Sequence, residues 1–157
     1  MKETGCCPRL NSSQWHKKTH KWSNKPFYKT KYLSIFHIPL NFGQVIVKAI
    51  NELEAKKIMK KDLFMSLSRE DGPFSSTLLI AIPKAVEGLP MENLSGEFIS
   101  LVFEGDYKNT GKWVQETIDY VKSNKKEVKD LLFWYATCPK CAKVYGNAQT
   151  VIFARVK

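Results

Sequence analysis

The chain has 157 residues, a net charge of +10, and 43% hydrophobic and 25% charged residues, a composition typical of one globular domain with a sizeable core. No apolar run approaches the ~20 residues that cross a bilayer. No apolar stretch follows the charged start, as it would in a secretory signal. We therefore expect a cytoplasmic protein without a membrane partner, in which the cysteines seldom form structural disulfides.

The basic charge lies mostly near the start of the chain. Residues 1–31 hold eight lysines and arginines against one glutamate, with Trp15 and Trp22 among them. Such a mixture either stacks on exposed bases or anchors a coil to a protein surface. We interpret residues 1–29 as a basic aromatic arm and residues 30–157 as the folded domain. Because lysine outnumbers arginine, which is the better reader of phosphates and bases, a nucleic-acid partner is not expected.

The first half of the domain predicts one helix among three strands. Residues 30–38 are β-branched and aromatic, as in a strand, and Pro39 ends them. Apolar side chains at helical spacing follow over residues 40–57. Strands are expected at 63–69 and 75–83, where an intervening Asp-Gly-Pro turn indicates a hairpin.

The second half predicts one helix and three more strands. A helix is expected from Asn109 or Thr110 to Ser123, and strands at 96–104, 131–136 and 149–156. The strand at 96–104 alternates, so that two sets of side chains point to opposite faces: Phe98, Ser100, Val102 and Glu104 on one face, and Ile99, Leu101 and Phe103 on the other.

This order of elements predicts an α+β fold. Two strand-helix-strand-strand halves would form an antiparallel sheet with both helices on one face. Such a layered arrangement leaves a groove along the free face of the sheet or between the halves.

Residues 94–124 carry the most characteristic local pattern. A strand is followed by a Gly-x-Tyr turn at Gly105 and Tyr107, and then by an amphipathic helix bearing Trp113. Further on, Tyr135 ends a strand and a proline follows four residues later.

In this order and spacing the chain resembles the GyrI-like (gyrase-inhibitor-like) family over roughly residues 30–157. That family shares its fold with bacterial effector-binding domains and SOUL haem-binding proteins. The resemblance implies a cleft for a small molecule, often cationic or aromatic. In many relatives a glutamate two positions before the strand tyrosine serves charge recognition or hydrolysis. Phe133 occupies that position here, which weakens both expectations, and the nearby Glu104 and Asp130 do not match the motif.

A groove in this half would be walled by aromatic rings, whose faces bind organic cations at ~0.5–2 kcal/mol per contact. A carboxylate such as Glu104 would add charge selection, and with Tyr107 it could supply acid–base catalysis. The alternative is that the rings belong to the core and Glu104 pairs with a lysine. The four candidate ligand-binding residues are Phe103, Trp113, Trp134 and Tyr135.

The sharpest short motif is a Cys-Pro-Lys-Cys turn from Cys138 to Cys141. Two cysteines at this spacing can share a tetrahedral metal ion, and Cys6 or Cys7 could complete a structural zinc site. A thioredoxin-like redox role fits badly, because too little chain follows for the βαβ structure that this fold needs. A surface turn with ordinary reduced cysteines is the third interpretation.

These observations leave three hypotheses of function. The leading one is a stand-alone protein that senses or sequesters a small organic molecule and has no DNA-reading unit. The second is a hydrolase that acts on a reactive electrophile. The third is an interaction protein that works through its basic arm. The ligand and the oligomeric state, including a homodimer, remain open.

Overall fold

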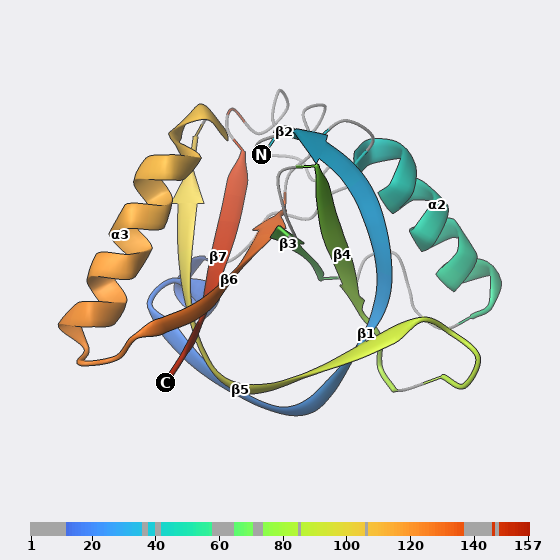
Figure 1. Cartoon of the computed structure of the whole chain (residues 1–157), viewed down its shortest axis with the longest axis horizontal. Helices are drawn as coiled ribbons and strands as arrows, with labels where there is room; N and C mark the ends of the chain where they lie inside the picture. Colours follow the sequence, from blue (N-terminus) through green and yellow to red (C-terminus); the bar gives the residue numbers. More distant parts are fainter. Residues whose placement is uncertain are drawn as a thin grey trace. The chain divides into compact units, whose positions relative to one another are not determined.

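A computed structural model describes residues 12–35, 38–39, 42–57, 65–70, 74–84, 86–105, 107–136, 146 and 148–157. The described part is an α+β protein (Figure 1), as predicted. Its contacts divide the chain into two units, which we call the first unit, residues 24–94, and the second unit, residues 1–23 with 95–157.

The first unit consists of one helix and an antiparallel sheet. Its strands are β1 (Lys18–Ile35, from Asn24 onward), β2 (Ile38–Pro39), β3 (Ser66–Glu70) and β4 (Ser75–Ala81). They pair in the order β2-β1-β4-β3. The pairing of β3 with β4 confirms the predicted hairpin.

The helix of the first unit, α2 (Phe42–Ala55), covers one face of that sheet. Its apolar positions recur at the helical spacing seen in the sequence, which places Ala49, Ile50 and Leu53 together on one side. These residues pack against Tyr28, Tyr32, Leu78 and Ile80 of the sheet.

The second unit repeats the same topology. Its strands are β5 (Met91–Glu104, from Ser95 onward), β6 (Val128–Tyr135) and β7 (Gln149–Val156), paired antiparallel in the order β5-β7-β6. Along the chain, the 3₁₀ turn η2 (Tyr107–Asn109) and helix α3 (Thr110–Ser123) follow β5 and precede β6. Figure 1 shows α3 beside the strands of this unit. In both units the first strand pairs with the last. The helix α3 follows β5, whereas the two-residue strand β2 comes between β1 and α2.

The two faces of the second unit's sheet follow the predicted alternation of β5. Ile99, Leu101 and Phe103 lie in the core under α3, together with Trp113 and Val121 of that helix. Phe98 and Ser100 point to the other face and are also fully buried. Both faces of β5 are therefore covered, which explains why its second half is almost uniformly apolar.

The strand β1 begins at Lys18, inside the segment that the sequence analysis assigns to an arm. The short helix α1 (Ser12–Trp15) precedes it. Thr19, Lys21 and Ser23 are exposed, whereas His20 and Trp22 between them are only partly exposed. This alternation is that of a strand with one solvated face. Its many lysines hid this pattern.

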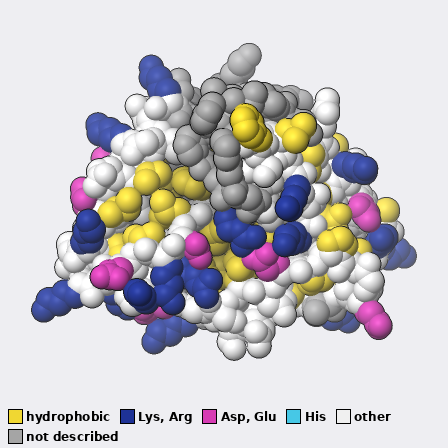
Figure 2. Space-filling view, in the orientation of Figure 1, with side chains coloured by type: hydrophobic (Ala, Val, Ile, Leu, Met, Phe, Trp, Pro, Cys, Tyr) yellow, Lys and Arg dark blue, Asp and Glu magenta, His cyan; other side chains and the backbone are white. Residues whose placement is uncertain are grey.

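Basic side chains are spread over the visible face among hydrophobic and other surface, with fewer acidic ones (Figure 2). None of the described helices is long and apolar enough to cross a membrane.

Candidate functional site

The register of the second unit separates the four aromatic residues predicted to line one groove. Phe103 and Tyr135 both pair with Thr150 of β7, whereas Trp134 pairs with the next residue of that strand. Because neighbouring residues of a strand point to opposite faces, Trp134 faces away from the other two. Trp113 lies with Phe103 in the core under α3. The four side chains therefore do not line one common surface.

Three of these predicted residues belong to the helix-covered face. Phe103 and Trp113 stack with 5.5 Å between ring centroids and 13° between planes, and both are buried. Tyr135 stacks on Phe133 at 6.2 Å and 8°. Phe133, at the position for which the resemblance in sequence implies a glutamate, is thus a core residue. These contacts support the alternative in which these rings stabilise the fold.

The opposite face carries a second group of rings, which we call the aromatic cluster: Trp15, His20, Trp22, Phe98, Trp134 and Phe153. Its floor is fully buried, since Phe98 and Phe153 are 0% exposed. Trp22 lies 4.4 Å from Phe98 between centroids, and Trp15 meets Trp134 edge-on at 5.3 Å.

Solvent reaches the upper rings of this cluster, because Trp15, His20 and Trp22 are all partly exposed. The cluster therefore offers aromatic surface to a molecule from solution. Sequence reasoning noticed the two tryptophans as anchors of an arm. It did not connect them with the β5 and β7 residues beneath, because a long stretch of chain separates them.

Hydrogen bonds to β5 fasten the segment that carries the upper rings. The Nδ1 atom of His16 accepts a hydrogen bond of 3.1 Å from the backbone N–H of Val102. The hydroxyl of Ser100 donates to the carbonyl of Trp15 at 2.5 Å. His20 Nε2 lies 2.8 Å from the same hydroxyl oxygen. Local pairing to a neighbouring strand therefore positions the rings.

His20 is the titratable group of the aromatic cluster. Its ring centroid lies 5.5 Å from that of Trp15, 6.2 Å from that of Trp22 and 5.7 Å from that of Phe153. Burial among these rings lowers the pKa of His20 below its usual value of 6.5, because it disfavours the charged imidazolium. His20 is therefore neutral at neutral pH.

The structure describes the side chain of only one residue of the predicted catalytic pair, Glu104 and Tyr107. Glu104 is exposed at the end of β5, on the same sheet face as the aromatic cluster, and accepts a hydrogen bond of 3.2 Å from Gln149 Nε2. Tyr107 lies in the turn η2, but its side chain is outside the described part of the structure. Cooperation between Glu104 and Tyr107 stays a prediction.

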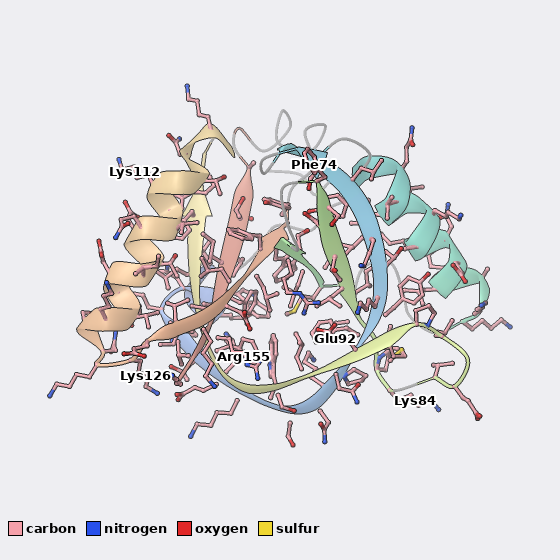
Figure 3. The ribbon with its side chains drawn as sticks, in the orientation of Figure 1. Phe74, Lys84, Glu92, Lys112, Lys126 and Arg155 are labelled. Atoms are coloured by element: carbon pink, nitrogen blue, oxygen red, sulfur yellow. The ribbon has the colours of Figure 1, made fainter. Side chains whose placement is uncertain are left out.

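The first unit contains a second polar group, built around Glu92 (Figure 3). Arg69 donates hydrogen bonds of 2.5 and 3.1 Å to the two carboxylate oxygens of Glu92. Lys29 Nζ lies 3.4 Å from one of these oxygens. The hydrogen bonds from Arg69 are the main reason why the pKa of Glu92 is lowered. Since both carboxylate oxygens of Glu92 have basic partners, we interpret this group of charges as stabilising the first unit.

The predicted zinc site lies outside the described residues, which include none of Cys6, Cys7, Cys138 and Cys141. Among the described residues, no group of three or more histidine, cysteine or acidic side chains could hold a metal ion. Zinc binding stays a prediction. The zinc content of the purified protein, compared with that of a Cys138→Ser/Cys141→Ser variant, tests it.

Comparison with known proteins gives one family match. A family model described as "Bacterial hydrolase" matches residues 1–156. No curated protein matches the chain significantly.

Solved structures share the fold over about nine-tenths of the chain. The C-terminal domain of EcmrR is 8% identical with a TM-score of 0.66, and the match covers 91% of this chain and 98% of that one. SAV2435, solved with tetraphenylphosphonium bound, is 14% identical with a TM-score of 0.53 and coverages of 89% and 93%. A hydrolase from Listeria innocua is 10% identical with a TM-score of 0.64 and coverages of 90% and 93%. At these identities the likeness establishes the fold alone.

Proposed function

The chain belongs to the bacterial hydrolase family, and on that basis we propose that it acts on small organic molecules, with the aromatic cluster as its binding site. We infer a GyrI-like protein whose ligand is aromatic and cationic. The observation that carries this proposal is the set of partly exposed rings of Trp15, Trp22 and His20 above the buried Phe98 and Phe153.

Several features of the cluster suit an aromatic cation. Ring faces attract organic cations by ~0.5–2 kcal/mol per contact, and His20 adds no opposing charge because its pKa is lowered. The carboxylate of Glu104 lies on the same face of the sheet. The solved complex of SAV2435 with tetraphenylphosphonium, a bulky aromatic cation, supports this ligand class for a protein of the same fold.

Titration calorimetry with tetraphenylphosphonium tests the proposal. Trp22→Leu keeps apolar volume but removes a ring face, so we expect its dissociation constant to rise by roughly tenfold. Phe74→Ala is the matched control, because this side chain is 64% exposed in the first unit (Figure 3) and should bind as the wild type does. Absence of binding to the wild type, or equal binding to Trp22→Leu, contradicts the proposal.

Hydrolysis of a bound electrophile is the second candidate function. The family description and the solved Listeria innocua hydrolase favour it. In this scheme Glu104 acts as the base that activates water, and Tyr107 donates a proton to the leaving group.

A panel of chromogenic aryl esters tests the catalytic roles. Glu104→Gln and Tyr107→Phe should each abolish turnover, whereas Glu116→Gln, an exposed substitution on α3, should not. Turnover that survives both site substitutions removes these two residues from the mechanism.

A further inference from the structure

The hydrogen bonds around Ser100 determine which ring nitrogen of His20 carries a proton. A hydroxyl has one hydrogen to donate, and that of Ser100 goes to the carbonyl of Trp15. The contact of 2.8 Å with His20 Nε2 therefore requires the ring nitrogen to donate and the hydroxyl oxygen to accept. The neutral ring of His20 thus carries its hydrogen on Nε2 and a lone pair on Nδ1.

The hydroxyl of Ser100 fixes this tautomer because it cannot form a hydrogen bond with water instead. Its side chain is 0% exposed, so its hydroxyl cannot turn to solvent. Reversing the chain of donors would leave the Trp15 carbonyl without this hydrogen bond, which disfavours the other tautomer.

In this network the Nδ1 atom of His20 remains available as a hydrogen-bond acceptor. None of the described residues donates a hydrogen bond to it. The ring that bears it lies among Trp15, Trp22 and Phe153 and is itself partly exposed. A hydrogen-bond acceptor thus lies within an aromatic surface that solvent can reach.

We propose that His20 Nδ1 is the specificity-determining acceptor of the aromatic cluster, and that the cluster prefers protonated aromatic amines over quaternary aromatic cations. This inference rests on the proposed binding function and names its ligand class. A protonated amine offers both a positive charge for the ring faces and an N–H donor for Nδ1. A quaternary ammonium or phosphonium ion offers only the charge.

A matched pair of ligands isolates this hydrogen bond. 1-Naphthylmethyl-dimethylammonium and 1-naphthylmethyl-trimethylammonium share one ring system and one charge, but only the first has an N–H. By calorimetry at pH 7.5, we expect the wild type to bind the dimethyl compound about tenfold more tightly, as a charged hydrogen bond predicts.

Two substitutions at His20 separate its two nitrogens. In His20→Gln the side-chain amide can still donate to Ser100, but the Nδ1 acceptor is lost, so the two ligands should bind within about twofold of each other. In His20→Asn the carbonyl oxygen replaces Nδ1, so part of the preference should return. Thr19→Ala is the control on the same strand, because Thr19 is exposed next to His20, and it should keep the full preference.

The outcomes distinguish the role of His20 from the proposed binding function. Equal binding of the ligands by the wild type, or a preference that survives in His20→Gln, overturns the role of His20 while leaving the binding site intact. Failure of the wild type to bind either ligand overturns the proposed function itself. Long-range ¹H–¹⁵N NMR of the wild type needs no variant, and a proton found on Nδ1 of His20 also overturns the inference.

Discussion

Ser100 is the residue on which the aromatic cluster depends most. Its hydroxyl joins the Trp15 carbonyl and the His20 ring, two groups that precede it in sequence by some eighty residues. Buried polar groups that lose a partner retain the full cost of leaving water. A small polar residue in an apolar strand therefore ties the start of the chain to its second half.

Ser100→Ala should lower the free energy of unfolding by about 1–3 kcal/mol, because it leaves both partners unsatisfied. Urea denaturation followed by circular dichroism measures this. Ser123→Ala removes an exposed hydroxyl at the end of α3 and should cost much less. Equal losses in the two variants would show that the buried network adds little.

His20 should make stability depend on pH below neutrality. Its pKa in the folded protein is lowered from 6.5 by burial, so the unfolded chain binds the proton more readily. Stability is then fully present above pH 6.5 and is lost as the pH falls toward the lowered pKa.

Urea titrations at pH 7.5 and 5.5 check this sign. The wild type should lose more stability than His20→Gln between these two pH values. The window lies above the usual value of 4.5 for carboxyl groups, so Glu92, whose pKa is lowered, contributes little there. A His20→Gln protein with the same pH dependence would refute the assignment.

At the scale of elements, α3 and β1 place aromatic residues on two different faces of one sheet. Trp113, Thr117 and Val121 are the buried residues of α3, at the spacing of one helical face. Trp113 therefore faces the core, whereas β1 brings Trp22 to the aromatic cluster. Two tryptophans with similar sequence surroundings have different structural roles.

Trp113→Leu and Trp22→Leu should therefore affect different properties, namely the stability of the fold and the affinity for ligand. Trp113→Leu should destabilise the fold by roughly 2–4 kcal/mol, because it leaves a cavity beneath α3, yet leave the affinity for tetraphenylphosphonium within about twofold. Trp22→Leu should chiefly weaken binding. Thermal denaturation and calorimetry on both proteins measure this, and a Trp113→Leu protein that is stable but cannot bind would return Trp113 to the site.

At the scale of the whole molecule, the described residues form two units in which β1-β4-β3 and β5-β7-β6 pair in the same order, and a fourteen-residue helix lies in the chain between the first strand and the other two of each set. The strand β1 contributes residues to both units, as does β5. Residues from Lys18 onward are consequently part of the sheet, and the basic charge of Lys18, Lys21, Lys25, Lys29 and Lys31 is carried on a strand.

Deletion of residues 1–29 should therefore unfold the protein, because it removes the β1 residues from Lys18 onward together with Trp15 and Trp22. Circular dichroism and thermal denaturation would show the lost cooperative transition. A Lys17→Gln/Lys18→Gln/Lys21→Gln variant removes exposed charge and should stay folded. A truncated protein that melts like the wild type would support the interpretation of residues 1–29 as an independent arm.

Periodicity was sufficient for most of the elements. The two helices and the strands at 75–83 and 149–156 were predicted within two residues of their observed bounds, and the strand at 96–104 was predicted with the correct end but begins at Met91. Regular burial of one face imposes a regular spacing of apolar side chains. The alternation of β5 was also confirmed.

The residues of the candidate site could not be predicted from periodicity. Whether Phe103 and Trp134 share a surface depends on which residues of β7 they pair with, and one residue of register reverses the answer. The lysines of β1 concealed a strand whose aromatic residues pack against partners far along the chain.

Local spacing thus specified the α+β class, the helices and the faces of individual strands, since these depend on backbone geometry within a few residues. Folding specified which faces meet, and with them the aromatic cluster, the contact between His20 and Ser100, and the separation of Trp113 from Trp134. The reason is that contacts between distant segments depend on strand order and register, which short-range periodicity does not encode.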